Sequence, residues 1–333
     1  MPLTDSKAKW LVTGGAGFIG SHLVETLLRE GEQVVALDSL VTGHQRNLDD
    51  AVKRAGGDAG SRFTFIKGDI TSLETCQAAC PGVDYVLHQA ALGSVPRSIA
   101  LPLDSHRANV DGFVNMLLAA RDAKVKRFVF ASSSSVYGDE PTLPKVESRT
   151  GRVLSPYAAT KHINEVYASV FERTYGIETI GLRYFNVFGP RQDPNGAYAA
   201  VIPRWIAALL EGQPCLINGD GSTSRDFCFV ANAVQANVRA ALTQVPGATD
   251  QIYNVAVGGK TSLLELYELI RARLSKQRPA IAKLEPTFQP FRPGDIKDSQ
   301  ADISKAKEKL GYGPTHTVAQ GMDELVAYVF QGT

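Results

Sequence analysis

Short apolar runs alternate with longer amphipathic stretches over the first half of the chain. Six short, mostly apolar runs read as strands: 10–13, 33–38, 63–67, 85–88, 128–131 and 179–183. Four stretches with helical periodicity lie between them: 19–30, 73–80, 105–123 and 156–175. Alternation of this kind predicts a parallel sheet with helices on both faces, and strands buried on both faces are expected to be apolar throughout.

The pattern changes after Asn186. Residues 189–199 are rich in Pro, Asn and Gly and read as a loop, and 216–218 and 225–230 flank an Asp-Gly turn that predicts a hairpin. Further elements are predicted at 233–242 (helix), 252–257 (strand), 261–274 (helix) and 303–310 (short helix). The prediction is an α/β protein with a Rossmann-type doubly wound parallel sheet and a smaller mixed α/β C-terminal substrate domain. We place the first domain at 1–187, with about 232–258 returning to it, and the second at 188–231 and 259–333.

Composition narrows the class of protein. The 333 residues carry a formal net charge of +1, which argues against binding nucleic acid or a membrane surface as the main task. No apolar run approaches about 18 residues, and no signal peptide precedes the first strand, so we expect a cytoplasmic protein. Cys76 and Cys80 lack a second pair, and the six histidines show no ligand spacing. We therefore expect reduced cysteines and no metal.

A glycine-rich loop follows the first predicted strand and opens the first predicted helix. Its glycines are Gly14, Gly17 and Gly20, with Phe18 and Ile19 in the same turn. Glycine allows a tight turn and a close approach of the backbone to a pyrophosphate, while a helix N-terminus offers free N–H groups to that anion. A strand before and a helix after are the context that this motif requires. We therefore expect a dinucleotide to bind here.

Acidic residues end or follow the next two strands. Asp38 ends the second strand, where a carboxylate accepts hydrogen bonds from ribose hydroxyls and repels a 2′-phosphate, which favours NAD over NADP. Taken alone, Asp38 reads equally well as a solvated carboxylate at a strand end. Asp69 and Ile70 follow the third strand, where they either border the adenine or form an ordinary turn.

A run of serines, 132–135, ends the fifth predicted strand, at the edge where open α/β sheets bind ligands. Tyr157 and Lys161 are four residues apart on a predicted helix and therefore share a face. A lysine ammonium near a phenol favours the phenolate, which makes Tyr157 a usable general base near neutral pH. Each feature alone has an ordinary explanation, an amphipathic helix face or a strand-end turn. The occurrence of the serine run, Tyr157 and Lys161 in this order, after a glycine-rich loop, indicates that they form a catalytic site together.

With these motifs, the sequence resembles the extended short-chain dehydrogenase/reductase superfamily, and within it the nucleotide-sugar epimerases. The resemblance is carried by 13–20, Asp38, 68–69, 88–91, 132–138, 155–161, 182–191 and 225–227. It implies a Rossmann domain that binds NAD, a C-terminal domain that binds a UDP-sugar, and a homodimer formed through helices 105–123 and 156–175. Residues in the first of these helices that suit a packed face, Ala108, Leu117, Ala119 and Ala120, suit packing within one chain equally well.

The resemblance also implies site residues. It places Ser133 and Tyr157 at the reacting hydroxyl, Lys161 on the nicotinamide ribose, and Asn186 and Arg225 on the UDP side. The cofactor set that it implies is Gly14, Gly17, Phe18, Ile19, Gly20, Asp38, Ser39, Gly43, Asp69, Ile70, Gln89, Ala91, Tyr157, Lys161, Tyr184 and Val187. The substrate set is Gly93, Ser94, Arg97, Ser133, Ser134, Ser135, Tyr157, Asn186, Val201, Asn218, Arg225, Arg292 and Ser299.

Two serines bear on the reaction type. Dehydratases of the family carry an Asp-Glu pair where this chain has Ser134 and Ser135, and the sugar-acid decarboxylases keep the glutamate. A 4-epimerase needs neither acid, because its 4-keto sugar turns over in the pocket and takes the hydride back on the other face. The resemblance therefore favours C4 epimerisation.

The substrate expected is a UDP-N-acetylhexosamine, UDP-GlcNAc or UDP-GalNAc. Segments 93–98 and 196–203, with Ser299, resemble bacterial 4-epimerases of that class. Gly93 and Ser94 leave room for a 2-acetamido group, and Ser134 and Ser299 offer it hydroxyls, since a buried unpaired amide costs about 1–3 kcal/mol. Arg97 pairs with either a pyrophosphate or a uronic-acid carboxylate. UDP-glucose/UDP-galactose and a UDP-N-acetyl-uronic acid therefore stay open as substrates.

Two other functions compete with epimerisation. A net dehydrogenase on this scaffold would accumulate NADH with turnover. A non-catalytic NAD-binding regulator would need the glycine loop but neither Tyr157 nor Lys161, and both are present.

Overall fold

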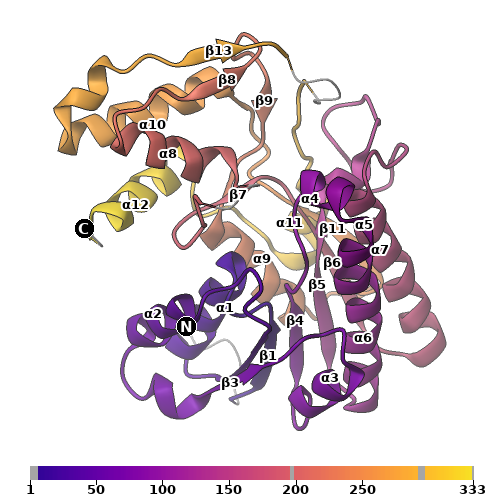
Figure 1. Ribbon diagram of the computed structural model, residues 1–333. Helices are drawn as coiled ribbons and strands as arrows, with labels where there is room; N and C mark the ends of the chain where they lie inside the picture. Colours follow the sequence, from indigo (N-terminus) through magenta and orange to yellow (C-terminus); the bar gives the residue numbers. More distant parts are fainter. Residues whose placement is uncertain (1–6, 196–198, 292–296, 332–333) are drawn as a thin grey trace.

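The computed structural model describes residues 7–195, 199–291 and 297–331. Its centre is one seven-stranded sheet in the order β11-β6-β5-β4-β1-β2-β3 (Figure 1). The strands are β1 (Lys9–Thr13), β2 (Gln33–Asp38), β3 (Phe63–Lys67), β4 (Tyr85–His88), β5 (Arg127–Ser133), β6 (Thr179–Tyr184) and β11 (Gln251–Val255). All neighbouring pairs are parallel. The Rossmann-type α/β prediction is confirmed.

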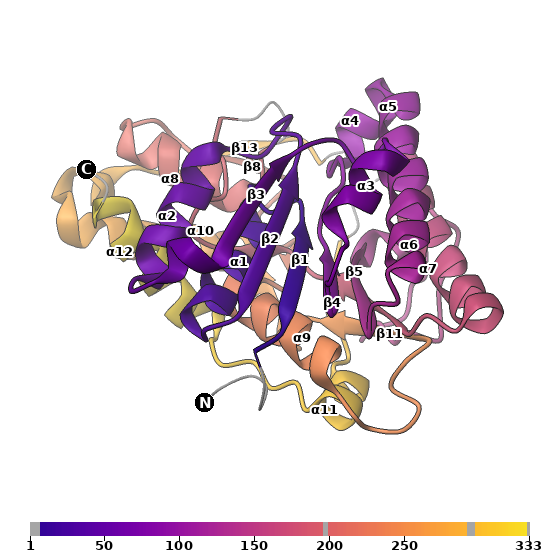
Figure 2. The same cartoon turned by 90° about the horizontal axis from the view of Figure 1, so that it is seen from below.

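Helices cover both faces of this sheet, as Figures 1 and 2 show. One layer contains α1 (Phe18–Arg29), α2 (Gln45–Ala55) and α9 (Val230–Leu242), and the other contains α3 (Leu73–Ala79), α6 (Gly112–Asp122) and α7 (Pro156–Tyr175). Successive residues of β1 serve the two layers in turn, since Trp10 and Val12 belong to one apolar cluster and Leu11 to the other. This alternation is why the strands are apolar along their whole length.

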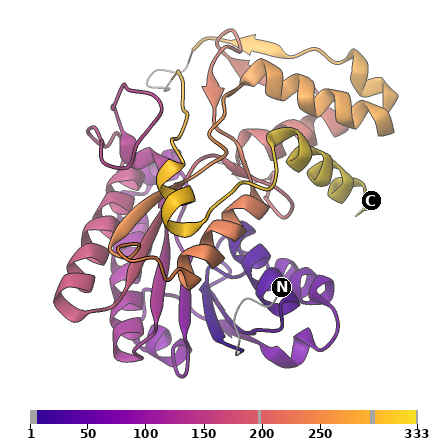
Figure 3. The ribbon, with the colours of Figure 1, turned by 180° about the vertical axis from the view of Figure 1, so that it is seen from behind.

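Smaller elements form a second layer over the carboxyl edge of the sheet (Figure 1). The helices there are α8 (Val201–Leu210), α10 (Leu263–Gln277), α12 (Val318–Gln331) and the 3₁₀ turn η4 (Pro279–Lys283). The short strands are β7 (Val187–Phe188), β8 (Leu216–Asn218), β9 (Ser224–Arg225), β10 (Cys228–Phe229), β12 (Thr261–Ser262) and β13 (Thr287–Gln289). The chain passes more than once between the central sheet and these smaller elements, which we call the C-terminal layer. After entering the C-terminal layer it returns to form β11 in the sheet and to pack α9 and α11 (Ser304–Leu310) against it (Figure 3).

The predicted hairpin around Asp220 is wrong. The turn exists, with Gly219 and Gly221 at φ of 76° and 82°. Yet β8 pairs in parallel with β13, and β9 pairs antiparallel with β12. Strands of two or three residues form too few hydrogen bonds to hold a hairpin together by themselves, so partners distant in the sequence decide the pairing.

Other differences concern helices. The segment predicted as one helix at 105–123 is divided into α5 (Pro102–His106), the π-helical turn η2 (Arg107–Asp111) and α6. The short helix α4 (Val95–Ala100) and the 3₁₀ turns η1 (Ala59–Arg62) and η3 (Ser134–Tyr137) complete this part. Helices α2, α8 and α12 were not predicted. In α2 only Asn47, Leu48 and Ala51 are buried, so its apolar stripe is too thin to recognise.

Candidate active site

The glycine loop leaves the N-terminus of α1 open. Gly17 is the N-cap residue, and no side chain caps the helix. A Cβ on Gly20 would lie 2.0 Å from the carbonyl oxygen of Gly14, and one on Gly14 would lie 2.7 Å from the nitrogen of Ala90. The close packing of the loop against its own backbone and against Ala90 is therefore possible only with glycine at these positions. A loop of this shape fits a pyrophosphate.

The carboxylate of Asp38 lies beside this loop at the end of β2. It accepts hydrogen bonds from the backbone nitrogens of Ala16 (2.9 Å) and Leu40 (2.8 Å). Burial raises its pKa, and the two N–H donors oppose that shift. Ser39 follows Asp38 directly, and a Cβ on Gly43 would lie 2.9 Å from Asp38 Oδ1. The carboxylate and the crowded backbone around it fit a ribose diol.

Asp69 and Ile70, which follow β3, form a turn. Asp69 Oδ1 accepts a 2.8 Å hydrogen bond from the nitrogen of Thr71, and Ile70 is buried against α6, where a Cβ on Gly112 would meet its side chain. Both residues still follow the third strand at the edge predicted to border the adenine.

Ser133, Tyr157 and Lys161 converge where β5 meets α7. Ser133 Oγ accepts hydrogen bonds from the backbone nitrogen (3.1 Å) and the hydroxyl (2.9 Å) of Ser135. Burial raises the pKa of Tyr157, and a hydrogen bond with Ser133 opposes that shift. Lys161 Nζ donates to the carbonyl of Ala131 at 2.8 Å and lies 5.9 Å from the centroid of the Tyr157 ring. Burial lowers the pKa of Lys161 to about 8.

A closed ring of three hydrogen bonds joins β4, β6 and α9 beside this cluster. Asn237 Nδ2 donates to the Tyr184 hydroxyl (2.7 Å), which donates to Gln89 Oε1 (2.9 Å), and Gln89 Nε2 donates to Asn237 Oδ1 (3.0 Å). Asn237 was not predicted. The available signal was an asparagine on the apolar face of an alanine- and valine-rich helix, where a buried amide requires partners. The predicted Ala91 follows β4, and Val187 begins β7.

The loop after β4 is tied to the start of α7. Ser94, at φ of 135°, caps α4 by accepting a 3.1 Å hydrogen bond from the nitrogen of Arg97. Ser98 Oγ accepts a 3.0 Å hydrogen bond from the nitrogen of Tyr157. A Cβ on Gly93 would meet no heavy atom within 4 Å. The loop thus presents open space close to the helix that carries the tyrosine.

Four residues predicted for the UDP side or the acetamide are Asn186, Arg225, Ser299 and Ser134, and only Arg225 and Ser299 share a hydrogen-bond acceptor. Asn186, at φ of 32°, donates through Nδ2 to the carbonyl of Asp226 at 3.4 Å. The carbonyl of Ser224 accepts from Arg225 Nη1 (2.8 Å) and from the nitrogen of Ser299 (3.1 Å), so these two are close. Ser134 begins η3, at the end of β5.

The remaining predicted substrate residues are more scattered. Asn218 ends β8 and pairs with Gln289 of β13, and Val201 begins α8. Arg292 lies outside the described residues.

Asp226 is a second residue that was not predicted as functional. Its buried carboxylate accepts hydrogen bonds from the nitrogens of Val257 (3.0 Å), Gly258 (3.1 Å) and Ala301 (3.2 Å), and burial raises its pKa to about 6. It thereby ties the segment containing Ser299 to the end of β11. Its place directly after Arg225, immediately before the apolar run 227–230, was the available signal.

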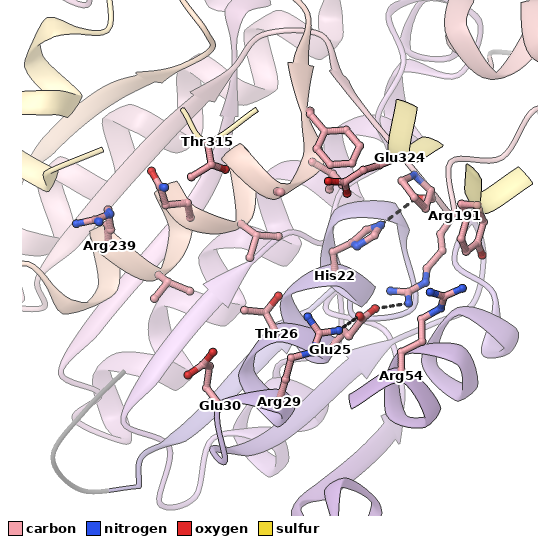
Figure 4. Close-up of a pocket in the computed structure, with 18 of the residues that line it drawn as sticks. His22, Glu25, Thr26, Arg29, Glu30, Arg54, Arg191, Arg239, Thr315 and Glu324 are labelled. Atoms are coloured by element: carbon pink, nitrogen blue, oxygen red, sulfur yellow. Dashed lines mark hydrogen bonds and ion pairs between the residues drawn. The ribbon is translucent and has the colours of Figure 1, made fainter. Parts of the chain in front are cut away.

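A cavity of about 910 Å³ lies apart from all these residues, between the outer side of α1, α9 and α12 (Figure 4). At its edge, the Arg191 guanidinium forms ion pairs with Glu25 of α1 and Asp50 of α2. His22 donates to the carbonyl of Pro190 at 3.0 Å, and burial together with the Arg191 charge lowers the pKa of His22 to about 4. These contacts fasten the segment that leads into the C-terminal layer.

Two further observations limit the chemistry. The four cysteines are free and buried, and burial raises their pKa values to about 12, so their thiols stay protonated near neutral pH. Among the described residues, no helix is both long enough and apolar enough to cross a bilayer.

Known proteins resemble this chain over almost its whole length. The model of the NAD dependent epimerase/dehydratase family matches residues 10–256. UDP-glucose 4-epimerase of Mycolicibacterium smegmatis is 39% identical over 320 residues, which cover 96% of this chain and 97% of that protein.

Two solved structures are similarly close. UDP-N-acetylglucosamine 4-epimerase of Methanobrevibacter ruminantium, in complex with UDP-N-acetylmuramic acid, is 36% identical with a TM-score of 0.89, covering 98% of this chain and 100% of that one. UDP-glucose 4-epimerase of Thermus thermophilus, in complex with NAD, is 33% identical with a TM-score of 0.81, covering 98% and 99%.

Proposed function

The chain belongs to the NAD-dependent epimerase/dehydratase family and is an NAD-dependent UDP-sugar 4-epimerase, and we propose that its substrates are UDP-N-acetylhexosamines. The proposed reaction is the reversible interconversion of UDP-GlcNAc and UDP-GalNAc through a transient 4-keto sugar.

The observation that carries the N-acetyl preference is the open space at Gly93. A Cβ there meets nothing within 4 Å, whereas Ser94 and Ser98 fasten the same loop to α4 and α7. A loop held by these two hydrogen bonds, with room beside the exposed Gly93, suits a 2-acetamido group. Ser134 and Ser299 are proposed to hydrogen-bond the acetamide, because leaving that amide unpaired would cost about 1–3 kcal/mol. The likeness to a UDP-N-acetylglucosamine 4-epimerase supports the same choice.

We assign the site residues as follows. The loop of Gly14, Gly17 and Gly20 holds the NAD pyrophosphate, and Asp38 holds a ribose. When bound, NAD supplies a hydride acceptor and donor at C4 of the sugar. The other cofactor contacts are assigned to Phe18, Ile19, Ser39, Gly43, Asp69, Ile70, Gln89, Ala91, Tyr184 and Val187. The sugar nucleotide is assigned to Arg97, Ser135, Asn186, Val201, Asn218, Arg225 and Arg292 in addition to Gly93, Ser94, Ser134 and Ser299.

Ser133, Tyr157 and Lys161 have different roles in moving the proton of the sugar hydroxyl. Tyr157, as phenolate, accepts the proton of the C4 hydroxyl as the keto sugar forms and returns it after the sugar has turned over. The hydrogen bond with Ser133 and the ammonium of Lys161 both favour the phenolate against the burial that raises the pKa of Tyr157. With serine at 134 and 135, neither of these two positions directly after β5 offers a carboxylate to eliminate water, so the keto sugar is reduced again.

The UDP-glucose/UDP-galactose pair is the second candidate. It is favoured by the similarity to a UDP-glucose 4-epimerase at 39% identity. A UDP-N-acetyl-uronic acid is the third, with Arg97 as partner of its carboxylate.

We also propose two features of the whole protein. Residues 1–187 with about 232–258 bind NAD, and 188–231 with 259–333 bind the sugar nucleotide. A homodimer is proposed to form through the segments 105–123 and 156–175, where Val166 and Val170 of α7 are exposed, as are Leu101 and Leu103 just before the first segment. Leu117, Ala119 and Ala120 of α6 are buried within the chain and do not support the dimer. Light scattering on the purified protein measures the oligomeric state, and a monomeric mass would contradict the dimer.

The test of function is to add UDP-GlcNAc to the purified protein without cofactor and to follow the anomeric and H4 signals by proton NMR. UDP-Glc and UDP-GlcNAcA are run in parallel. UDP-GalNAc is expected to appear fastest. Exclusive conversion of UDP-GlcNAcA would move the substrate to the uronic acid, and no conversion of any sugar, with NAD added, would contradict the proposal.

A further inference from the structure

One buried carboxylate near the candidate site has no role in the steps above. Glu165 lies on α7 four residues after Lys161 and eight after Tyr157, so the three side chains project from one face of the helix. It is 8% exposed, and its two carboxylate oxygens accept hydrogen bonds from two other elements of the fold.

The first of these elements is the end of β5. Ser132 Oγ donates to Glu165 Oε1 in a short hydrogen bond. Ser132 is flanked by Ala131, whose carbonyl accepts from Lys161 Nζ at 2.8 Å, and by Ser133, which hydrogen-bonds Tyr157. Glu165 therefore hydrogen-bonds Ser132, which lies between the two β5 residues that contact Lys161 and Tyr157.

The second element is β6. Arg183 lies directly opposite Ser132 in the sheet, and its guanidinium donates to both oxygens of Glu165, from Nε at 2.9 Å and from Nη2 at 2.8 Å. Arg183 itself is 3% exposed, and it also donates through Nη1 to the carbonyl of Glu147. A two-point arginine–carboxylate pair fixes orientation as well as distance.

We propose that Glu165 is a positioning residue for the epimerase reaction: it locks the end of β5 against α7 so that Ser133 and the Ala131 carbonyl meet Tyr157 and Lys161, and its negative charge favours the ammonium form of Lys161. This inference deepens the proposed function and rests on it.

The charges around Lys161 support the second part. On α7 it faces Tyr157 and Glu165, on β5 the Ala131 carbonyl, and on β4 His88, whose pKa burial lowers to about 3, so that it is neutral. The Arg183 guanidinium of β6 lies behind Glu165. Burial lowers the pKa of Lys161 to about 8, and the negative charge of Glu165 opposes this shift. Without that charge, the ammonium would lose its proton at lower pH.

The experiment compares Glu165→Gln with Glu172→Gln in the NAD-loaded enzyme. Glu172 is the matched control, because its carboxylate on the same helix binds the backbone of Thr179 and Asp250 and none of the catalytic residues. For Glu165→Gln we expect the alkaline limb of the kcat–pH profile to move about one unit lower, so that kcat falls about fivefold at pH 8 and about tenfold at more alkaline pH, since one pKa unit is a tenfold change in equilibrium. KM is expected to stay the same. An equal loss at every pH would overturn the charge role.

A second measurement needs neither substrate nor cofactor chemistry. Hydrogen–deuterium exchange of the peptide containing 131–135 is expected to speed up in Glu165→Gln and to match wild type in Glu172→Gln. Unchanged exchange would overturn the positioning role. Glu165→Asp keeps the charge but shortens the reach, so it should restore the alkaline limb while leaving kcat low; an unrestored limb counts against the proposal. If wild type epimerises no UDP-sugar, the proposed function fails while the exchange result still decides whether Glu165 holds β5.

Discussion

On the β1–β2 side of the sheet edge, the structure offers mainly the backbone of the glycine loop, with one carboxylate, Asp38, beside it, whereas on the β5–β6 side it offers a cluster of buried ionisable side chains. The first side depends on glycine, because Cβ atoms at Gly14 and Gly20 would collide with the backbone of Ala90 and of Gly14. The second depends on protonation, since burial shifts the pKa values of Tyr157 and Lys161. Damage to the first side should therefore act through shape at every pH, and damage to the second through charge and pH.

The largest effect is expected on the charged side, from Tyr157→Phe. Losing the proton acceptor should lower kcat about 10²–10⁴-fold, the usual contribution of a positioned general base. NAD should stay bound, because the glycine loop is untouched. Single-turnover assays and the NAD content of the purified protein measure both. Tyr167→Phe, on the outer face of the same helix, is the control, and activity retained in Tyr157→Phe would refute the assigned base.

The next effect is expected on the backbone side, from Gly20→Ala. The new methyl group would lie 2.0 Å from the Gly14 carbonyl oxygen, so the loop must open, at a cost of about 1–3 kcal/mol. The protein should lose most of its NAD and melt at lower temperature at all pH values. Gly60→Ala is the matched control, because a Cβ there meets nothing within 4 Å. NAD content equal to wild type in Gly20→Ala would contradict the loop's assignment.

The same comparison explains which features could be predicted from the sequence. The glycine loop and the Tyr157–Lys161 pair are local, because each lies within a few residues of one strand or helix. Two other features join residues that are distant in the sequence. One is the set of hydrogen bonds from Ser132 and Arg183 to Glu165, and the other is the hydrogen-bonded ring of Gln89, Tyr184 and Asn237. The hairpin prediction was wrong for the same reason, because β8 pairs with β13, which is distant in the sequence. Local chemistry is readable from spacing, but contacts across the fold are not.

Stability should fall in mild acid because two histidines, the half-buried His22 and the buried His88, are held in the neutral form. The pKa of His22 on α1 is lowered to about 4, and that of His88 on β4 to about 3. Between these values and about 6.5 the unfolded chain binds more protons, so stability is lost as pH falls through that range, by about 2 kcal/mol per histidine from about pH 7 to about pH 5.

Melting curves at several pH values measure this loss. Replacing His22 or His88 by Gln should flatten the pH slope, whereas the same replacement of the exposed His162 serves as the control. Asp226, whose pKa is raised to about 6, opposes part of the trend, since folding favours its protonated form. A slope that stays the same in both the His22 and the His88 variants would contradict the account.

The smallest effect is expected in the C-terminal layer, from Ser299→Phe. If Ser299 helps to hold the acetamide, kcat/KM for UDP-GlcNAc should fall about tenfold, within the cost of about 1–3 kcal/mol for an unpaired amide. UDP-Glc has no acetamide and serves as the internal control. Equal losses on both sugars would sink this role for Ser299.

The central claim is the preference for N-acetylated UDP-sugars, and a competition assay tests it most directly. UDP-GlcNAc and UDP-Glc are mixed in equal amounts with the enzyme, and the initial rates of both products are followed together by NMR, so that their ratio gives the ratio of kcat/KM. The account predicts that UDP-GalNAc forms several-fold faster than UDP-Gal. UDP-Gal forming as fast or faster would contradict it.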